Sequence, residues 1–261
     1  MAARRAPRSP RLPKRALLFD LDGTLADTAP DLGAALNHAL ATRDLPPIRP
    51  VHYRPLVGGG AASLVQAALD WHGLALPPTE HKRLVAALLD FYRAHIADRT
   101  RLFAHLSTCL RRFRAAGIGL AVVSNKREDL ARLVLEKLGA ASFFALIVGG
   151  DTLPQKKPDP EPIQHALRAL GSAPDHAVMI GDSEQDIGAA RRAGCAVICV
   201  RFGYHPHFLP RSPAAPPPQA DGILDSYANL PRLLAQIAPQ LFAPEHSAQE
   251  PFAQARPRRG R

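Results

Sequence analysis

Short apolar runs alternate along this chain with segments of helical periodicity. None of the runs has the every-second-residue pattern of a strand with one face in water, and unbroken runs of this kind are typical of strands buried on both faces. The predicted strands are Ala16–Phe19, Leu120–Val123, Leu146–Val148, Ala177–Ile180 and Ala196–Val200. Helical patterns lie between them over Glu128–Leu138, Glu161–Leu170 and Asp186–Ala193. This alternation predicts an α/β fold, a doubly wound parallel sheet with helices on both faces.

One segment breaks the alternation, because only helical patterns occur between about Pro30 and Asp98. We expect helices over Asp31–Arg43, Ala61–Trp71 and Thr79–Ala97, with Thr79 as the N-cap of the third and Trp71 packed in the core. Helices inserted after the first strand predict an α-helical cap above the sheet. The expected organisation is therefore a core domain over residues 16–28 and 98–238 and a helical cap domain over residues 29–97.

The formal net charge of +10 is concentrated at the two ends of the chain. Residues 1–15 carry +6 and residues 251–261 carry +4, which leaves residues 16–250 formally neutral. A nucleic-acid-binding face would make the folded domain basic, so the charge does not predict a nucleic-acid partner. The ends are rich in proline and arginine, and we expect disordered basic tails over residues 1–15 and 239–261.

The sequence also indicates the cellular compartment in which the protein is expected. No apolar run approaches the ~18–20 residues of a membrane-spanning helix, and the N-terminal segment lacks the apolar stretch of a secretory signal. Cys109, Cys195 and Cys199 are too few and too scattered for a disulfide framework or a zinc site. We expect them to be buried in a reducing environment, so a cytoplasmic location without a membrane partner is predicted.

A parallel sheet binds its ligands at the carboxyl ends of its strands. Polar residues stand at these ends, directly after the predicted strands. They are carboxylates, small hydroxyls, an amide and lysines: Asp20, Asp22, Thr24, Ser124, Asn125, Lys126, Lys156, Lys157, Asp182 and Asp186. Carboxylates brought together repel one another unless a cation neutralises them, and an all-oxygen set favours Mg²⁺ over zinc. A hydroxyl, backbone N–H groups and a lysine suit a bound phosphate. Because aspartate can attack phosphorus while a second carboxyl transfers protons, the set favours phosphoryl transfer.

Four of these stretches, DLDGTLADT, VVSNK, KKPDPEP and GDSEQD, resemble in order and spacing the motifs of the haloacid-dehalogenase-like phosphohydrolase superfamily. The resemblance covers about residues 16–235. Within it, FDLDGTLADTAPDL, the RPLVGGG turn, GGDTLPQKKPDPEP and VMIGDSEQDIGAARRAGC are similar to phosphoglycolate phosphatases. The resemblance implies a Mg²⁺-dependent phosphomonoester hydrolase that acts through an aspartyl-phosphate, with the small phosphorylated substrate 2-phosphoglycolate.

The resemblance also implies roles for three aspartates. Asp20 is the expected nucleophile and a Mg²⁺ ligand, and Asp182 is a second ligand. Asp22 is expected to protonate the leaving alkoxide, then to activate water, and to reach the metal through its backbone carbonyl. An acid at this position favours ester hydrolysis over dehalogenation, because a halide leaves without a proton.

The resemblance also implies residues that would bind the phosphoryl group. Ser124 and the N–H of Asn125 are expected to hold the phosphoryl oxygens, and Lys157 to neutralise charge on the phosphoryl group and Asp20. The adjacent Lys156 stays open as an alternative to Lys157. The supporting residues around them are Asp186, which would orient a metal-bound water or the lysine, Gly23, which would allow a tight turn, and Thr24.

Two stretches depart from the phosphatase pattern. A Tyr-Pro-Gly-like turn is replaced by residues 102–106 (LFAHL), and a Gly-Tyr-Asn pattern by residues 203–205 (GYH). Neither change touches the four motifs, but both leave the substrate open. The alternatives are a phosphatase of the same fold acting on a sugar phosphate or nucleotide, a phosphomutase, and a non-enzymatic nucleic-acid-binding or scaffold protein. A monomer and a homodimer are both compatible with the sequence.

Two conspicuous motifs are interpreted as structural. Gly58-Gly59-Gly60 lacks the lysine and spacing of a nucleotide-binding loop, so we expect it to bend the cap, near the substrate at most. His205-Pro206-His207 has no third metal ligand nearby and is predicted to be a plain loop.

Overall fold

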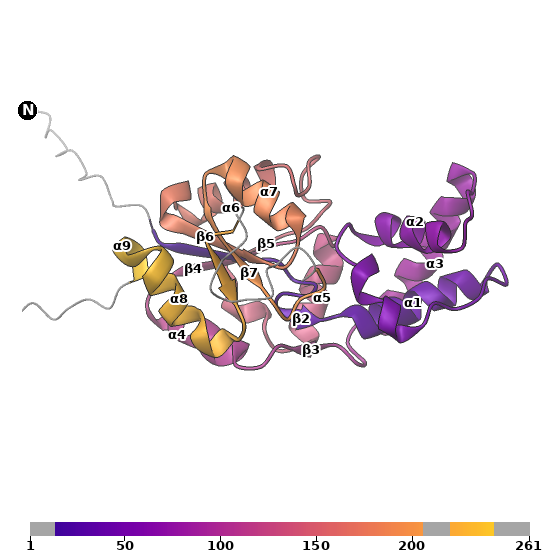
Figure 1. Ribbon diagram of the computed structural model, residues 1–261, viewed down its shortest axis with the longest axis horizontal. Helices are drawn as coiled ribbons and strands as arrows, with labels where there is room; N and C mark the ends of the chain where they lie inside the picture. The colour runs from indigo at the N-terminus through magenta and orange to yellow at the C-terminus, as the bar shows by residue number, and fades with distance from the viewer. Residues whose placement is uncertain (1–13, 206–219, 243–261) are drawn as a thin grey trace, which may run out of the picture.

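The structure is a computed structural model that describes residues 14–205 and 220–242. Its core is a six-stranded sheet in the order β5-β4-β1-β6-β7-β8, and every neighbouring pair is parallel (Figure 1). The chain reverses its direction of travel across the sheet at β1, which opens a crevice at the carboxyl ends of the central strands. The predicted doubly wound α/β fold is confirmed. The strands are β1 (Ala16–Phe19), β4 (Gly119–Val123), β5 (Leu146–Val148), β6 (Ala177–Gly181), β7 (Ala196–Val200) and β8 (Gly222–Leu224).

Helices bury both faces of the sheet. In β1, Leu17 and Phe19 join one apolar cluster with α4, α5 and α8, whereas Ala16 and Leu18 join a second cluster with α6 and α7 (Figure 1). This two-sided burial explains why the runs show no alternation. The helices are α4 (Leu106–Ala115), α5 (Glu128–Lys137), α6 (Glu161–Leu170), α7 (Glu184–Ala193), α8 (Leu230–Ile237) and the short α9 (Pro239–Phe242). Single 3-10 turns cover Ala141–Phe143, Pro174–His176 and Tyr227–Asn229.

A separate group of helices lies beyond one end of the sheet, at the right of Figure 1. It comprises α1 (Ala29–Ala41), α2 (Ala61–Trp71), α3 (Pro78–Ala94) and two 3-10 turns (Pro50–His52 and Arg54–Leu56). The chain leaves the sheet along β2 (Ala26–Asp27) and returns along β3 (Arg101–Leu102), and these two strands pair antiparallel. The division into a core domain over residues 16–28 and 98–238 and a cap domain over residues 29–97 stays a prediction.

Several local expectations differ from the structure. Thr79 is not the N-cap of α3, because Pro77 takes that place and Pro78 begins the helix, where a residue without an N–H leaves no donor unpaired. The side chain of Trp71 is 54% exposed, so the expectation of core packing is wrong. Residues 239–242 of the predicted tail form α9 instead, where Leu241 is buried and its carbonyl accepts a hydrogen bond of 2.8 Å from Arg15. Lys14 and Arg15 of the predicted N-terminal tail also belong to the core, because the N–H of Lys14 donates to the carbonyl of Gly171 at 3.1 Å and the carbonyl of Arg15 accepts from the N–H of Gly119 at 2.9 Å. The tail residues 1–13 and 243–261 lie outside the described part of the chain.

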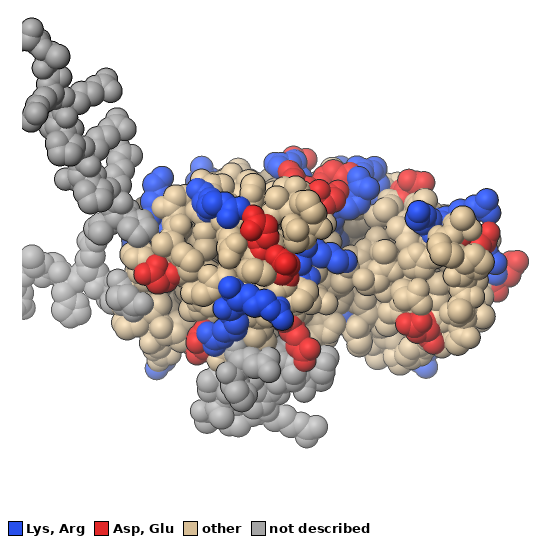
Figure 2. Space-filling view, turned by 90° about the horizontal axis from the view of Figure 1, so that it is seen from above, with Lys and Arg blue, Asp and Glu red and all other residues tan. Residues whose placement is uncertain are grey.

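Three general expectations can be compared with the described residues. Cys109, Cys195 and Cys199 are buried and free. No helix within the described ranges has the length and apolar character needed to cross a bilayer. On the face shown in Figure 2, the basic and acidic side chains of the described residues are interspersed, so this face carries no patch of a single sign.

Candidate active site

The turn after β1 brings its carboxylates to the crevice of the sheet. Asp20 follows β1 directly, and its N–H donates to the carbonyl of Ile180 in β6 over 2.9 Å. Gly23 then turns the chain with a φ of +82°, and a Cβ at this position would lie 2.3 Å from Asp182 Oδ2. Glycine is therefore required here both by its backbone conformation and by the close approach of Asp182. The turn and the loop after β6 are packed against each other.

Three buried carboxylates meet at this point. Oxygen atoms of Asp20, Asp182 and Asp186 all lie within 4.8 Å of one another. Asp186 is fully buried at the start of α7, where it forms a capping box with Ser183. Its Oδ2 also accepts hydrogen bonds from the N–H groups of Asp182 (3.1 Å) and Ser183 (3.0 Å). Asp186 therefore fixes the loop between β6 and α7.

Lys157 supplies the cation of this cluster. Its ammonium donates to Asp20 Oδ1 at 2.8 Å, to Asp186 Oδ1 at 2.6 Å and to the carbonyl of Val123 at 2.6 Å. The neighbouring Lys156 is exposed and donates to the carbonyl of Gly59 at 3.3 Å. The sequence left Lys156 open as an alternative to Lys157. In the structure, Lys157 alone of the pair contacts Asp20.

The cluster has a surplus of negative charge. Three carboxylates and the Lys157 ammonium leave a formal charge of −2 in a buried site. Burial raises the pKa of Asp20 to about 6 although Lys157 opposes the shift, and burial together with the charge of Asp20 raises the pKa of Asp182 well above its usual range. These shifts show how costly the fully ionised cluster is without a further cation. Hard oxygen donors with this charge fit Mg²⁺, so the residues present suit the implied metal.

The carboxylate of Asp22 lies apart from this cluster. Its Oδ1 accepts a hydrogen bond of 2.6 Å from Thr28 Oγ1 and lies 2.9 Å from Lys126 Nζ. The predicted ligand set contained Asp22 and placed Asp186 around it, whereas the clustered carboxylates are those of Asp20, Asp182 and Asp186. Contact between the Asp22 backbone carbonyl and a metal stays a prediction.

The residues after β4 line the other side of the crevice. Ser124 is buried, and its N–H donates to the carbonyl of Val148 at 2.9 Å. Asn125 donates through Nδ2 to the carbonyl of Lys157 at 3.0 Å, so the two segments predicted to bind phosphate are joined directly. Among the described residues, the buried Oδ1 of Asn125 and Oγ1 of Thr24 have no hydrogen-bond partner. The unpaired Oδ1 of Asn125, whose amide contacts the carbonyl of Lys157, is compatible with a ligand site.

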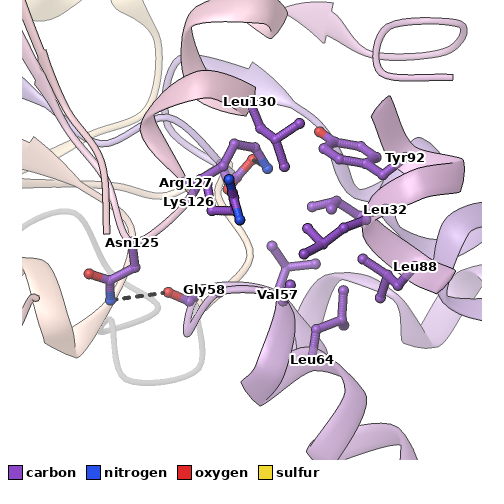
Figure 3. Close-up of a pocket in the computed structure, with 14 residues that line it drawn as sticks. Leu32, Val57, Gly58, Leu64, Leu88, Tyr92, Asn125, Lys126, Arg127 and Leu130 are labelled. Carbon is purple, nitrogen blue, oxygen red and sulfur yellow. Dashed lines mark hydrogen bonds and ion pairs between the residues drawn. The ribbon is translucent and has the colours of Figure 1, made fainter. Parts of the chain in front are cut away.

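Residues 57–60 approach Asn125 from the helical part. Gly60 is the N-cap of α2 with a φ of +88°, and a Cβ there would lie 3.0 Å from the carbonyl oxygen of Asn125. The Asn125 side chain also lies 3.5 Å from the carbonyl of Gly58 (Figure 3). The glycines therefore start a helix and allow a close approach to the site. His205 Nε2 lies 2.7 Å from the carbonyl of Val57, whereas Pro206 and His207 lie outside the described residues.

Two residues at the site received no role from the sequence. Tyr204 donates its N–H to Asp182 Oδ2 at 2.6 Å, and its hydroxyl accepts hydrogen bonds from the N–H groups of Thr28 (2.6 Å) and Ala29 (2.9 Å). Lys126 is buried beside Asp22 and lies 4.7 Å from the ring centroid of Tyr92. The Gly-Tyr pair at residues 203–204, which matches the Gly-Tyr-Asn pattern of the phosphatases, could have identified Tyr204, and the place of Lys126 directly after Ser124 and Asn125 could have identified Lys126.

A cavity of about 60 Å³ separates α1, α2 and α3 from the crevice (Figure 3). Its walls are mainly apolar, and Asp22, Tyr92, Asn125 and Lys126 contribute its polar groups together with Arg127. Because Asp22 and Asn125 belong to both places, the cavity borders the candidate site.

Comparison with known proteins gives consistent results. Residues 17–200 match the family model described as haloacid dehalogenase-like hydrolase. A phosphoglycolate phosphatase of Chromobacterium violaceum is 43% identical over 73% of this chain and 86% of its own length, and one of Neisseria meningitidis is 39% identical over 87% and 94%. The solved structure of a predicted phosphoglycolate phosphatase from Haemophilus somnus is 31% identical, with a TM-score of 0.76 over 84% of this chain and 97% of that chain.

Proposed function

Because this chain belongs to the haloacid dehalogenase-like hydrolase superfamily and, within it, to the phosphoglycolate phosphatase family, we propose that it hydrolyses 2-phosphoglycolate to glycolate and phosphate with Mg²⁺ as cofactor. The observation that carries this proposal is the buried set of Asp20, Asp182 and Asp186 with Lys157. Its net formal charge of −2 matches one divalent cation, and Lys157 supplies a fixed positive charge beside Asp20. The substrate itself follows from the named relatives.

Asp20, Asp182 and Asp186 would hold the Mg²⁺, and when bound the ion would neutralise the carboxylates and the negative charge of the phosphoryl group. Asp20 attacks the phosphorus atom, and the bond between phosphorus and the ester oxygen breaks as the aspartyl-phosphate forms. Lys157 stabilises the charge that develops on the phosphoryl oxygens, while Ser124 and the N–H of Asn125 orient them.

Asp22 performs the proton transfers in this proposal. It donates a proton to the leaving alkoxide in the first half-reaction and removes one from the attacking water in the second. Thr28 Oγ1 and Lys126 Nζ, which hold its Oδ1 at 2.6 and 2.9 Å, fix its position next to the cavity. The helical segment over residues 29–97 acts as a cap that excludes bulk water during these steps.

A phosphate-release assay with Mg²⁺ tests the function. We expect the wild type to release phosphate from 2-phosphoglycolate much faster than from sugar phosphates or nucleoside monophosphates. Replacing the attacking oxygen by an amide in Asp20→Asn should abolish release, while circular dichroism shows a folded protein. Release by a folded Asp20→Asn variant would show that the nucleophile is misassigned. Preference for another ester would reassign the substrate, and isomerisation without phosphate release would indicate a phosphomutase.

A further inference from the structure

We propose that Lys126 and the hydroxyl of Tyr92 bind the carboxylate of the substrate and so select small acidic phosphate esters. This inference rests on the proposed function and deepens it, because it assigns the recognition of the part of the substrate that is not transferred. It concerns the cavity between the helical segment and the crevice, whose lining includes Lys126 and Tyr92 (Figure 3).

Lys126 is a buried cation at the wall of this cavity. Its side chain is 6% exposed, and its ammonium lies 2.9 Å from Asp22 Oδ1 and 4.7 Å from the ring centroid of Tyr92. A buried ammonium is costly unless carboxylates or hydrogen-bond acceptors replace its water. A second carboxylate at this position would therefore be bound favourably.

Tyr92 provides an independent observation. It is 1% exposed, and its hydroxyl has no hydrogen-bond partner among the described residues. Figure 3 shows this hydroxyl directed towards the side of the cavity where Lys126 and Leu130 lie. Because a buried hydroxyl without a partner is unfavourable, an acceptor that enters the cavity would satisfy it. A carboxylate oxygen is such an acceptor.

The other walls restrict the shape of the ligand. They are mainly apolar side chains: Leu32, Val57, Leu64, Leu88, Leu89 and Leu130. The cavity volume of about 60 Å³ suits a small polar group such as a carboxylate. Arg127, the other cation on the lining, lies 3.2 Å from Asp129 and is half exposed, so water solvates its charge, unlike that of the buried Lys126.

The chemistry of 2-phosphoglycolate matches the position of Lys126. One methylene group separates the ester oxygen, which receives the proton from Asp22, from the carboxylate. When the ester oxygen contacts Asp22, the carboxylate lies one methylene group away. Lys126 is within hydrogen-bond distance of Asp22, so it lies close enough to bind this carboxylate. The arrangement favours an acidic substrate over a neutral one of the same size.

The test compares two esters with the same kind of leaving group, 2-phosphoglycolate and 2-hydroxyethyl phosphate, which lacks the carboxylate. Lys126→Met should lower kcat/KM for 2-phosphoglycolate about 100-fold, mainly through KM. The value for 2-hydroxyethyl phosphate should fall about tenfold less, and mainly through kcat, because that ester loses only the contact between Lys126 and Asp22. Tyr92→Phe, which removes only the hydroxyl, should raise KM for 2-phosphoglycolate about fivefold. The exposed Lys137→Met serves as the matched control and should leave both substrates unaffected.

Calorimetry gives a readout that does not depend on turnover. In the Asp20→Asn background, Lys126→Met should weaken the binding of 2-phosphoglycolate by a similar factor. An equal loss for both esters would overturn the inference, because Lys126 would then act only by positioning Asp22. Equal use of both esters by the wild type would overturn it as well. The absence of phosphate release from either ester would instead refute the proposed function.

Discussion

At the scale of the residue, adjacent side chains can have opposite surroundings. Lys156 is exposed, whereas Lys157 is 3% exposed and touches two carboxylates and a carbonyl oxygen. Burial alone would lower the pKa of Lys157, but Asp186 and Asp20 overcome this effect and raise it, so the ammonium stays charged. A lysine held in this way is a fixed positive charge beside the proposed nucleophile, and it costs no reorganisation during the reaction.

We therefore expect unequal effects from the same substitution at the two positions. Lys157→Met should lower kcat by about 10²–10³-fold, because it removes charge stabilisation from the phosphoryl group. Lys156→Met should change kcat by less than about threefold, since its exposed side chain contributes only a contact with Gly59. Steady-state kinetics with 2-phosphoglycolate measures both values. Similar losses in the two folded variants would contradict the assignment of Lys157.

At the scale of the element, the N-terminus of α1 is satisfied by a residue from a distant part of the chain. Thr28, the N-cap of α1, makes no side-chain cap hydrogen bond to the helix, and its hydroxyl donates to Asp22 instead. The hydroxyl of Tyr204 accepts from the N–H groups of Thr28, the N-cap residue, and of Ala29, the first helical residue. Because the N–H of Tyr204 donates to Asp182, this residue joins the start of the helical segment to the carboxylate cluster.

Removal of this hydroxyl should destabilise the protein. Tyr204→Phe leaves two buried N–H groups without their acceptor, so we expect the free energy of unfolding to fall by about 1–3 kcal/mol. Urea denaturation measures this change. Tyr53→Phe is a matched control with a smaller expected loss, because its donor, Asn37 Nδ2, keeps the carbonyl of Ile48 as a second acceptor at 2.9 Å. A loss at Tyr204 no larger than the loss at Tyr53 would show that the helix start does not depend on this contact.

At the scale of the whole molecule, the buried carboxylates link global stability to pH and to metal. In the metal-free protein the pKa of Asp20 is raised from 3.8 to about 6, so the folded state favours its protonated form. The resulting stabilisation is fully present below pH 3.8 and is lost as the pH rises through about 6. Each pKa unit corresponds to about 1.4 kcal/mol. Mg²⁺ would offset this loss by binding the ionised carboxylates.

The metal-free protein should therefore lose thermal stability as the pH rises from about 4 to about 7, and Mg²⁺ should restore it at the upper end of this range. Thermal unfolding followed by circular dichroism, with a chelator or with excess Mg²⁺, measures both effects. Asp20→Asn is the control, since an amide does not titrate, and it should reduce the pH dependence to the part that belongs to Asp182. The same slope in the wild type and in this variant would assign the effect to other groups.

The chain by itself determined the fold class and predicted which side chains would gather at the crevice. Unbroken apolar runs identify strands buried on both faces, and the acids, hydroxyl and lysines that follow them must meet at one edge of a parallel sheet. The strands β2, β3 and β8 were not predicted, because β2 and β3 have only two residues each and β8 begins with a glycine, so none of them forms an unbroken apolar run like that of β5. The helix α4 was also missed, although Leu106, Cys109, Leu110 and Phe113 share one face and are buried.

Only the tertiary structure decided which side chains touch. It separated Lys157 from Lys156, grouped Asp186 rather than Asp22 with the carboxylates of Asp20 and Asp182, and brought Tyr204 to the start of α1. Local pattern fixes the type and direction of an element, because it depends on neighbours along the chain. A contact between loops from different strands depends on how the helices pack the sheet, and no short stretch of sequence contains that information.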